Sequence, residues 1–526
     1  MNEQQLLRAL GDVQPTYLVE SEQPPQEKPQ KGHWKRWAAL AACVCLIAGA
    51  ALYHRFGGAK GSTPASTAGG GGRNIEEQSD TEASSFMSYA GPMFPLTLES
   101  AAGELTAERA TTMDFAPCAP RTVTEDDGNG GEFSYEIQSQ SIAVTDDYVL
   151  KNGSSHDVTV TALYPFVSSI YELEEQRPAI TVDGVTVEAP IYSGDFCGGF
   201  RPVEQTRPQE RWNIRHFNSW EDYVPVVTDS YLQNALSATA ELDQTVYVYT
   251  LTATGETDED AATVAMSFQL DSEKSTVLTY SFNGYGYDPE TGEEQHSFFT
   301  RNLRVAPRLA IVGEDIESYT LQGYQNGGCY PGTELDEISA DVVREEMTLS
   351  DFLRMITTEA LYAFPVYGDY DHVELTAQTE ALFYRAAVEF LLNYGVLSDH
   401  PAERYDSGRL DDLLLDTRSV DRVCYAAFEL TVPAGESVTV SAQYRKPASY
   451  DFYGASNGRE RLAGYDLVTQ LGSDLTFTRQ TASVETRGLV EIVQQSFGFD
   501  AENGVTTVTL DPSVEHYYMN VVFLKN

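Results

Sequence analysis

"DDYVLKNGSSHDVTVTALYPF", residues 146–166, is the stretch that decides the fold. Apolar and polar residues alternate on both sides of a polar centre, which is the period of a half-buried strand. The central Asn152-Gly153 is typical of a tight turn that needs positive φ. The stretch therefore predicts an antiparallel β-hairpin. The apolar residues that define the two faces are Tyr148, Leu150, Val158, Val160 and Ala162.

The same pattern continues along the chain toward the C-terminus. "AITVDGVTV" (179–187) predicts a second hairpin around Asp183-Gly184. Short alternating runs separated by turn residues are typical of antiparallel sandwiches. We expect a mainly β protein, an antiparallel β-sandwich with a helical insertion, preceded by one transmembrane helix. Further strand-like runs cover 245–255, 263–270, 275–287, 301–313, 424–446, 475–485, 504–511 and 516–525.

Helical patterns interrupt the strands. Thr348 and Asp351 form a plausible capping pair at the start of one helix. A second helix is expected to end at Gly395, a suitable left-handed cap, and residues 219–236 also have a helical pattern. The first helix has its apolar face at Leu349, Phe352, Leu353, Ile356 and Ala360, and the second at Leu382, Phe383, Ala386, Ala387, Phe390, Leu391 and Tyr394.

These patterns divide the chain into six parts. The last part either forms a separate domain or completes the first sandwich, and we favour two β units bridged by helices. The expected parts are a cytoplasmic tail (1–36), a transmembrane helix (37–53), a flexible linker (54–90), an extracellular β-sandwich domain (91–325), a mostly helical segment (326–418) and a C-terminal β domain (419–526).

Residues 37–53 are uncharged and rich in Ala, Leu, Val, Ile and Cys. At ~1.5 Å per residue a helix of this length nearly crosses a ~30 Å hydrocarbon core. A polar segment precedes it, which favours an uncleaved anchor over a signal peptide. Cleavage after 48–50 and a lipoprotein box at 40–43 are the alternatives. The basic residues favour a cytoplasmic N-terminus: Lys28, Lys31, Lys35 and Arg36 precede the span, whereas His54, Arg55 and Lys60 follow it.

The charge is distributed unevenly about this span. Six of the 34 Lys and Arg residues and five of the 79 Asp and Glu residues lie in 1–55, so the remainder has a formal charge of −46. A nucleic-acid partner is excluded by such a charge. The Gly-, Ser- and Thr-rich residues 57–85 read as a tether that holds an acidic domain away from the membrane.

Four cysteines lie beyond the apolar span: Cys118, Cys197, Cys329 and Cys424. They permit two disulfides in three connectivities. Cys197 and Cys329 both occur in Gly-rich loop sequence, which makes them the candidate disulfide. Buried free thiols are the alternative, because a large core does not need such a bond.

The sequence contains no HExxH, GxSxG, Walker or dinucleotide motif, and we expect no catalytic residue, metal or cofactor. Two acidic turns have the oxygen ligands that calcium prefers, although exposed hairpin tips are the favoured interpretation. The 31 tyrosines, Tyr247 and Tyr249 among them, either form a binding face on a sheet or act only as good strand formers. The acidic turns contain Asp288, Glu290, Glu293 and Glu294, and Asp126, Asp127, Asn129 and Glu132.

"LLRALGDVQPTYLVESEQP" (6–24), followed by "RWAALAACVCLIAGAAL" (36–52), resembles the start of anti-sigma-factor-like single-pass membrane proteins of Gram-positive bacteria. Residues 319–342 and 464–478 look like uncharacterised outer domains attached to such openings. The resemblance implies a cytoplasmic partner such as a sigma factor, and an outer domain that senses the envelope. The apolar face for that partner is Leu6, Leu7, Leu10, Tyr17 and Leu18.

The expected function is therefore sensing or signalling by a membrane-anchored, non-catalytic protein on the cell surface. The membrane itself, a sigma factor and an envelope or cell-wall ligand are the expected partners. A surface module for binding or adhesion is the alternative, and a surface hydrolase is the second alternative.

Overall fold

A computed structural model describes most of the chain after residue 87. The expected tail (1–36), the apolar stretch (37–53) and nearly all of the linker (54–90) lie outside the described residues. Within the described part, no helix is both long and apolar enough to cross a membrane. The described residues are 88–100, 102–126, 132–196, 200–202, 214–216, 239–259, 261–272, 274–288, 291–301, 303–325, 332–363, 376–393, 396–397, 408–451, 462–471 and 475–524.

The chain divides into two compact units. The first contains residues 119–139 together with 1–73, and its described part is a β-hairpin. The hairpin pairs β4 (Arg121–Asp126) with β5 (Glu132–Ile137) in antiparallel register. The second unit contains residues 74–118 and 140–526, and the other sheets and helices of this subsection belong to it.

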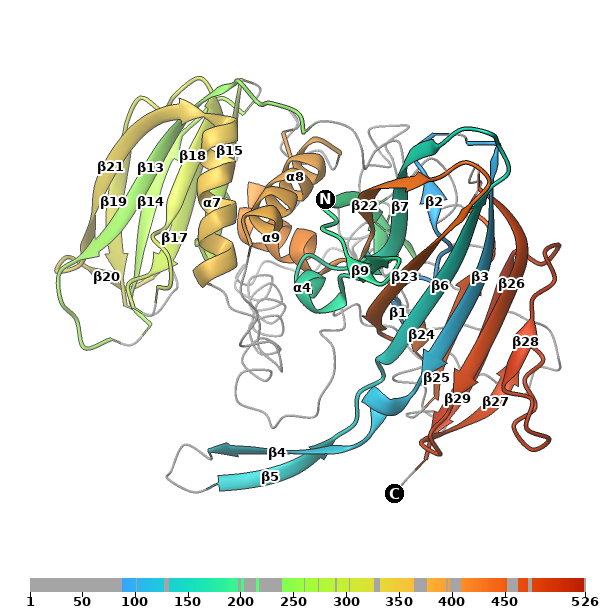
Figure 1. Cartoon of the computed structure of the whole chain (residues 1–526). Coiled ribbons are helices and arrows are strands. Elements are labelled where there is room, and N and C mark those ends of the chain that lie inside the picture. The colour runs from blue at the N-terminus through green and yellow to red at the C-terminus, as the bar shows by residue number, and fades with distance from the viewer. Residues whose placement is uncertain are drawn as a thin grey trace, which may run out of the picture. The chain divides into compact units, whose positions relative to one another are not determined.

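A seven-stranded sheet is the largest element of the second unit, and its central strands β3, β6 and β23 lie side by side (Figure 1). Its pairs are antiparallel except for β3–β26, which are parallel. In sheet order its strands are β28 (Thr507–Thr509), β26 (Thr476–Glu485), β3 (Leu105–Asp114), β6 (Ile142–Asn152), β23 (Ser437–Lys446), β8 (Ala179–Val182) and β9 (Val185–Thr186).

Two smaller sheets share a hydrophobic core with the seven-stranded sheet. One has the order β10 (Ile191–Phe196), β22 (Arg422–Val432), β7 (Val158–Ser168) and β2 (Thr97–Leu98). The other has the order β1 (Ser88–Tyr89), β24 (Tyr450–Asp451), β25 (Leu462–Val468), β29 (His516–Phe523) and β27 (Val490–Gln495). Shorter elements are η1 (Ala116–Cys118), α4 (Leu173–Gln176), and the pair β11 (Phe200–Pro202) and β12 (Ile214–His216).

The hairpin expected over residues 146–166 is wrong. The two runs form strands, but β6 pairs with β3 and β23, whereas β7 pairs with β22 and β2. The chain crosses from one sheet to the other between them, and Gly153 does not have the positive φ of a tight turn. Each run has one strongly apolar face. Because the runs lie in different sheets, both apolar faces pack into the same core between the sheets. Alternation identified the strands but not their partners.

The chain makes a second crossing of the same kind between β22 and β23, beside the first. Asn152 joins the two crossings. Its side-chain Nδ2 donates to the carbonyl oxygens of Val432 at 3.0 Å and His156 at 2.8 Å, and its Oδ1 accepts from Ser154 N at 2.8 Å. Its backbone N–H donates to Glu436 O. Asn152, which the sequence predicts to be a turn residue, thus links the two crossings.

Residues 179–187 form the hairpin that the sequence predicts. Asp183 and Gly184 have φ of 47° and 77°, and Val182 lies opposite Val185. Positive φ at both central residues is the geometry that Asp-Gly favours in two-residue hairpin turns.

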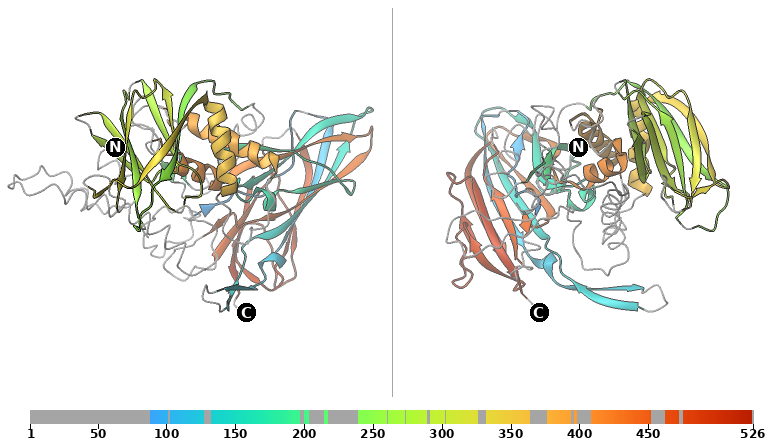
Figure 2. Two further views of the ribbon diagram at one scale, coloured as in Figure 1. Left: turned by 90° about the vertical axis from the view of Figure 1, so that its left-hand side faces the viewer. Right: turned by 180° about the vertical axis from the view of Figure 1, so that it is seen from behind.

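The middle of the chain, residues 245–348, forms a second pair of sheets with its own core, which we call the middle sandwich (Figure 2). β13 is buried on both faces, because Leu251 belongs to this core and Val246 packs with the helices. The four-stranded sheet has the order β15 (Ser275–Tyr280), β18 (Arg308–Gly313), β13 (Thr245–Thr254) and β21 (Ser339–Thr348). The five-stranded sheet has the order β16 (Gly284–Asp288), β17 (Glu293–Phe299), β14 (Thr263–Gln269), β19 (Tyr319–Tyr324) and β20 (Glu334–Leu335).

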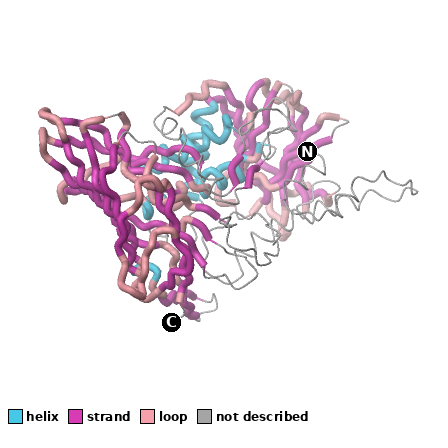
Figure 3. The backbone as a smooth tube through the Cα atoms, turned by 90° about the vertical axis from the view of Figure 1, so that its right-hand side faces the viewer, coloured by secondary structure: helices cyan, strands magenta, loops and turns pink. Residues whose placement is uncertain are grey.

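Strands far outnumber helices in the described chain (Figure 3), and three longer helices follow β21. The capping pair is confirmed, because Asp351 N donates to Thr348 Oγ1 at 3.1 Å and Thr348 Oγ1 donates to Asp351 Oδ2 at 2.8 Å. The apolar faces of the first two helices are buried as expected, whereas Tyr394, Gly395 and 219–236 lie outside the described residues. The helices are α7 (Leu349–Ala363), α8 (Ala377–Asn393) and α9 (Leu410–Ser419).

Strands from the two ends of the folded chain share sheets. β22 pairs with β7, β23 with β6, and β26 with β3. Residues 419–526, expected as a C-terminal β domain, therefore complete sheets that residues 97–186 begin. The middle sandwich and the helices lie between these two stretches in the sequence.

Replacing Asn152 with Ala tests the link between the two crossings. We expect the free energy of unfolding to fall by about 1–3 kcal/mol, because carbonyl oxygens buried at the crossings lose their donor. Urea denaturation of purified protein measures the change.

Asn503→Ala is the matched control, because Asn503 is exposed and its hydrogen bonds to the described residues go to Asp500 within its own turn. We expect this variant to change the stability by less than about 0.5 kcal/mol. Equal losses in the two variants would contradict the role of Asn152.

Candidate functional site

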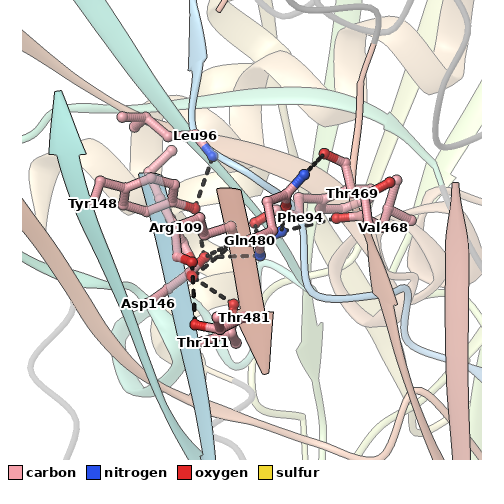
Figure 4. Close-up of polar contacts among 11 residues, drawn as sticks. Phe94, Leu96, Arg109, Thr111, Asp146, Tyr148, Val468, Thr469, Gln480 and Thr481 are labelled. Atoms are coloured by element: carbon pink, nitrogen blue, oxygen red, sulfur yellow. Dashed lines mark hydrogen bonds and ion pairs between the residues drawn. The ribbon is translucent and has the colours of Figure 1, made fainter. Parts of the chain in front are cut away.

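A fully buried ion pair lies at the centre of the seven-stranded sheet (Figure 4). Arg109 of β3 and Asp146 of β6 have side chains that are 0% exposed. Arg109 Nε donates to Asp146 Oδ1 at 2.9 Å, and Nη2 donates to Oδ2 at 2.9 Å. The carboxylate also accepts from Thr111 at 2.7 Å, Tyr148 at 2.5 Å and Tyr164 at 3.1 Å. Each charge therefore has several partners, as a buried charge requires.

The same guanidinium binds two backbone segments outside its own sheet. Nη1 of Arg109 donates to Val468 O, and Nη2 donates to Phe94 O, both at 2.9 Å. Tyr148 extends the contact, since its hydroxyl accepts from Leu96 N at 2.9 Å. We call Arg109, Asp146 and their bonded partners the buried ion network. It joins β3 and β6 to residues 94–96 and to the end of β25.

The chemistry of this network is that of a structural element. Burial is the largest influence on the pKa of Arg109 and lowers it, but the charge and hydrogen bonds of Asp146, together with Tyr148 and Tyr164, outweigh burial and raise the pKa above its usual value. Burial raises the pKa of Tyr148 and of Tyr164 well above the usual value, so both remain hydroxyl donors. With both ionic side chains sealed from solvent, a ligand has no route to them.

A second group of charges lies where α4, β22 and β23 meet. Glu172 is buried, and burial raises its pKa to about 6. Asp421 keeps part of its surface exposed, yet the surrounding protein and the nearby Glu172 charge raise its pKa to about 8. The buried Lys446 donates to Ala90 O at 3.1 Å and partly offsets both carboxyl charges. We call Glu172, Asp421 and Lys446 the acidic joint.

A surface accessible to a ligand lies at an edge of the middle sandwich. β16 is one of the two edge strands of the five-stranded sheet and pairs with β17. Tyr285 lies opposite His296 and Tyr287 opposite Glu294, so these four side chains share one face. We call these four residues the open aromatic edge.

This face is the one that forms the core of the middle sandwich. His296 and Glu294 lie opposite Met266 and Phe268 of β14, which are core residues. The opposing sheet has one strand fewer, and at β16 the core-facing side chains reach solvent. Tyr285 is 51% exposed and Tyr287 52% exposed.

The polar pair of the open aromatic edge is buried among rings. Glu294 is 5% and His296 3% exposed, and Glu294 Oε2 shares a hydrogen bond of 3.1 Å with His296 Nε2. The His296 ring stacks on Phe268 with centroids 5.6 Å apart and lies 5.2 Å from the Tyr285 ring. The edge thus combines two exposed tyrosines with a buried carboxylate and imidazole.

Most of the residues singled out from the sequence for binding lie outside the described part of the chain. These are Leu6, Leu7, Leu10, Tyr17 and Leu18 of the tail, and Cys197 and Cys329 of the candidate disulfide. Cys118 and Cys424 are described, and both are buried free thiols. Burial raises the pKa of each thiol to about 12, which disfavours the reactive thiolate.

The two acidic turns are both hairpin tips, as the favoured interpretation has it. Asp288 pairs with Glu293 on one face of the sheet, whereas Glu294 points to the other face. Asp126 pairs with Glu132 across β4 and β5. Glu290, Asp127 and Asn129 lie outside the described residues. Among the described residues, no group of three or more His, Cys, Asp or Glu side chains is placed to hold a metal ion.

Sequence reasoning missed both the buried ion network and the open aromatic edge. Arg109 and Asp146 lie 37 positions apart, and only the strand register brings them together. The edge left a clearer signal, because Tyr285 and Tyr287 alternate with Gly284 and Gly286 in "NGYGYD".

Comparison with known proteins found no protein-family model and no curated protein that matches this chain.

Replacing Arg109 with Met tests the buried ion network. We expect the free energy of unfolding to fall by about 3–5 kcal/mol, because Asp146 would become an uncompensated buried charge. Thermal and urea denaturation measure the loss.

Arg487→Met is the matched control, since Arg487 forms an exposed ion pair with Asp114, and exposed pairs contribute little to stability. A loss in Arg109→Met as small as the loss in the control would show that the network is dispensable.

The acidic joint predicts a pH dependence of stability. A carboxyl group with a raised pKa in the folded state binds protons more tightly folded than unfolded. Its stabilising contribution is complete below the unfolded pKa of ~4 and is lost as the pH rises through about 6 for Glu172 and about 8 for Asp421. We expect urea midpoints to fall between pH 5 and pH 8.5, and Asp421→Asn to flatten this fall.

Asp500→Asn is the control for the acidic joint. The bond from Asn503 lowers the pKa of the exposed Asp500, so this group stays ionised across the same pH range. The control should keep the wild-type slope, and an unchanged slope in Asp421→Asn would contradict the assignment.

Proposed function

We propose that this chain is a non-catalytic, single-pass protein of the cell membrane that senses or signals through an outer β-rich part. The observation that carries the proposal is the distribution of charge about residues 37–53. A basic segment precedes this uncharged stretch, and the chain beyond residue 55 has a formal charge of −46. Basic residues favour the cytoplasmic side of a span, which assigns the acidic part to the outside.

The folded part has features suited to a surface domain. The charges of Arg109 and Asp146 at the centre of the seven-stranded sheet belong to the buried ion network, which stabilises the fold. Its open aromatic edge presents two half-exposed tyrosines to solvent. Aromatic side chains with polar hydroxyl tips on a stable scaffold suit a binding surface.

The cytoplasmic side of the proposal rests on the resemblance of residues 6–24 to anti-sigma-like proteins. Leu6, Leu7 and Leu10, with Tyr17 and Leu18, would form an apolar face for a helix of the partner. A sigma factor is the partner that this resemblance implies.

Adhesion is the second candidate function, and the open aromatic edge is the observation that favours it. In that case the outer part would bind a cell-wall or envelope component, and the tail would serve only to set the topology.

Topology is tested by adding protease to intact cells that express the full chain. Immunoblotting of each end of the chain follows the digestion. We expect the part beyond residue 90 to be digested and the tail to survive. Protection of the β-rich part, or a mature N-terminus near Ala51 by mass spectrometry, would contradict the anchored topology.

Signalling is tested by affinity capture with a peptide of residues 1–30. We expect mass spectrometry to identify a sigma factor, and Leu6→Asp with Leu10→Asp to abolish its capture. Gln14→Asp is the control, because it adds charge at a polar position. Without recovery of a sigma factor the signalling role fails, and adhesion becomes the better explanation.

A further inference from the structure

We propose that the open aromatic edge is a binding site for a neutral sugar. Tyr285 and Tyr287 would contact the sugar, and the buried Glu294 and His296 would support the tyrosines from behind. The inference deepens the proposed function, on which it rests for the location of the site outside the cell.

The two tyrosines form a platform for stacking. They are alternate residues of one strand, so their side chains project from the same face about 7 Å apart. Each is about half exposed, which leaves ring surface for a ligand. Apolar ring area combined with a polar hydroxyl tip suits the mixed surface of a pyranose, which has C–H faces and a rim of hydroxyl groups.

The strand that carries the tyrosines has glycines at its other positions. Gly284 and Gly286 leave the opposite face of β16 without side chains until Asp288 at the hairpin end. A Cβ at Gly284 would collide with Ser297 Oγ of β17. Along 284–287 the strand therefore lies close against β17, and its large side chains, Tyr285 and Tyr287, project toward the open face.

Glu294 and His296 are polar residues at positions where a core normally has apolar ones. Glu294 and His296 occupy the row that Met266 and Phe268 continue as core residues. Burying two ionisable groups there costs free energy that apolar side chains would not cost. Polar groups that break the local pattern next to a solvent-exposed surface are typical of binding sites.

Charge favours a neutral ligand over an anionic one. Asp288 and Glu293 lie at the tip of the same hairpin, and the surrounding chain is strongly acidic. This field repels carboxylated or phosphorylated ligands.

Size favours a small ligand over a second protein. A stable protein interface buries about 800 Å² on each partner. Two half-exposed tyrosines on one five-residue strand provide only a fraction of that area, whereas a few sugar rings need no more.

The test measures binding of neutral tetraoses built on glucose, N-acetylglucosamine and mannose to the full chain. The protein is kept in amine-oxide micelles, which contain no sugar headgroup, and a tetragalacturonate serves as the anionic probe. We expect calorimetry to detect binding of at least one neutral tetraose, with the anionic probe at least tenfold weaker. Hydroxyl-radical labelling of Tyr285 and Tyr287 should fall when that tetraose is added to the wild-type protein.

Variants then assign the site. Tyr285→Ala with Tyr287→Ala should weaken binding by at least about tenfold, whereas Tyr285→Phe with Tyr287→Phe should keep it within about threefold, because the rings remain. Tyr362→Ala is the matched control, since Tyr362 is 56% exposed on α7. It should bind as the wild type does.

The proposal is overturned if no neutral tetraose binds, if the double alanine variant binds as tightly as the wild type, or if labelling of the two tyrosines is unchanged by the sugar. It is also overturned if the double variant alters only self-association, which would make the edge a contact between copies. Binding is measured on purified protein without a bilayer. Its failure is therefore distinct from a failure of the membrane topology.

Discussion

The interaction on which the fold depends is the ion pair between Arg109 and Asp146. An ion removed from water costs several kcal/mol unless its partners replace the lost hydration, and here both charges are fully buried. A slip of β3 against β6 by one residue would turn Arg109 or Asp146 to the opposite face of the sheet. The pair therefore fixes the register of the central strands, and through Val468 and Phe94 it fixes two further segments.

That register makes the two crossings possible. With β6 beside β23, and β7 beside β22, the paired strands pass together from one sheet to the other and Asn152 holds the crossings. The chain stretches before and after the middle sandwich are locked into common sheets. The middle sandwich has a core of its own, so its edge at β16 can vary without disturbing the ion network.

Local signals predicted the local elements. The Thr348–Asp351 cap, the Asp183-Gly184 turn and the buried helix faces follow from residues a few positions apart. The partners of the strands did not follow, because alternation along 146–166 reports that a face is buried and not which strand lies beside it. The buried ion network could not be predicted from the sequence for the same reason. The open aromatic edge was partly visible, since Gly and Tyr alternate over 284–287, but the burial of Glu294 and His296 depends on strands distant in sequence.

Native-state hydrogen exchange tests most directly whether the buried ion pair is the constraint that holds the fold. We expect the slowest amides of the whole chain to lie in β3, β6 and β26, around Arg109, Asp146 and Gln480, whose side-chain oxygen accepts from Arg109 Nη1 at 3.5 Å. These amides should exchange only when the protein unfolds globally. If these amides exchange faster than those of β13 and β14 in the middle sandwich, the ion pair is not the element on which the rest of the structure depends.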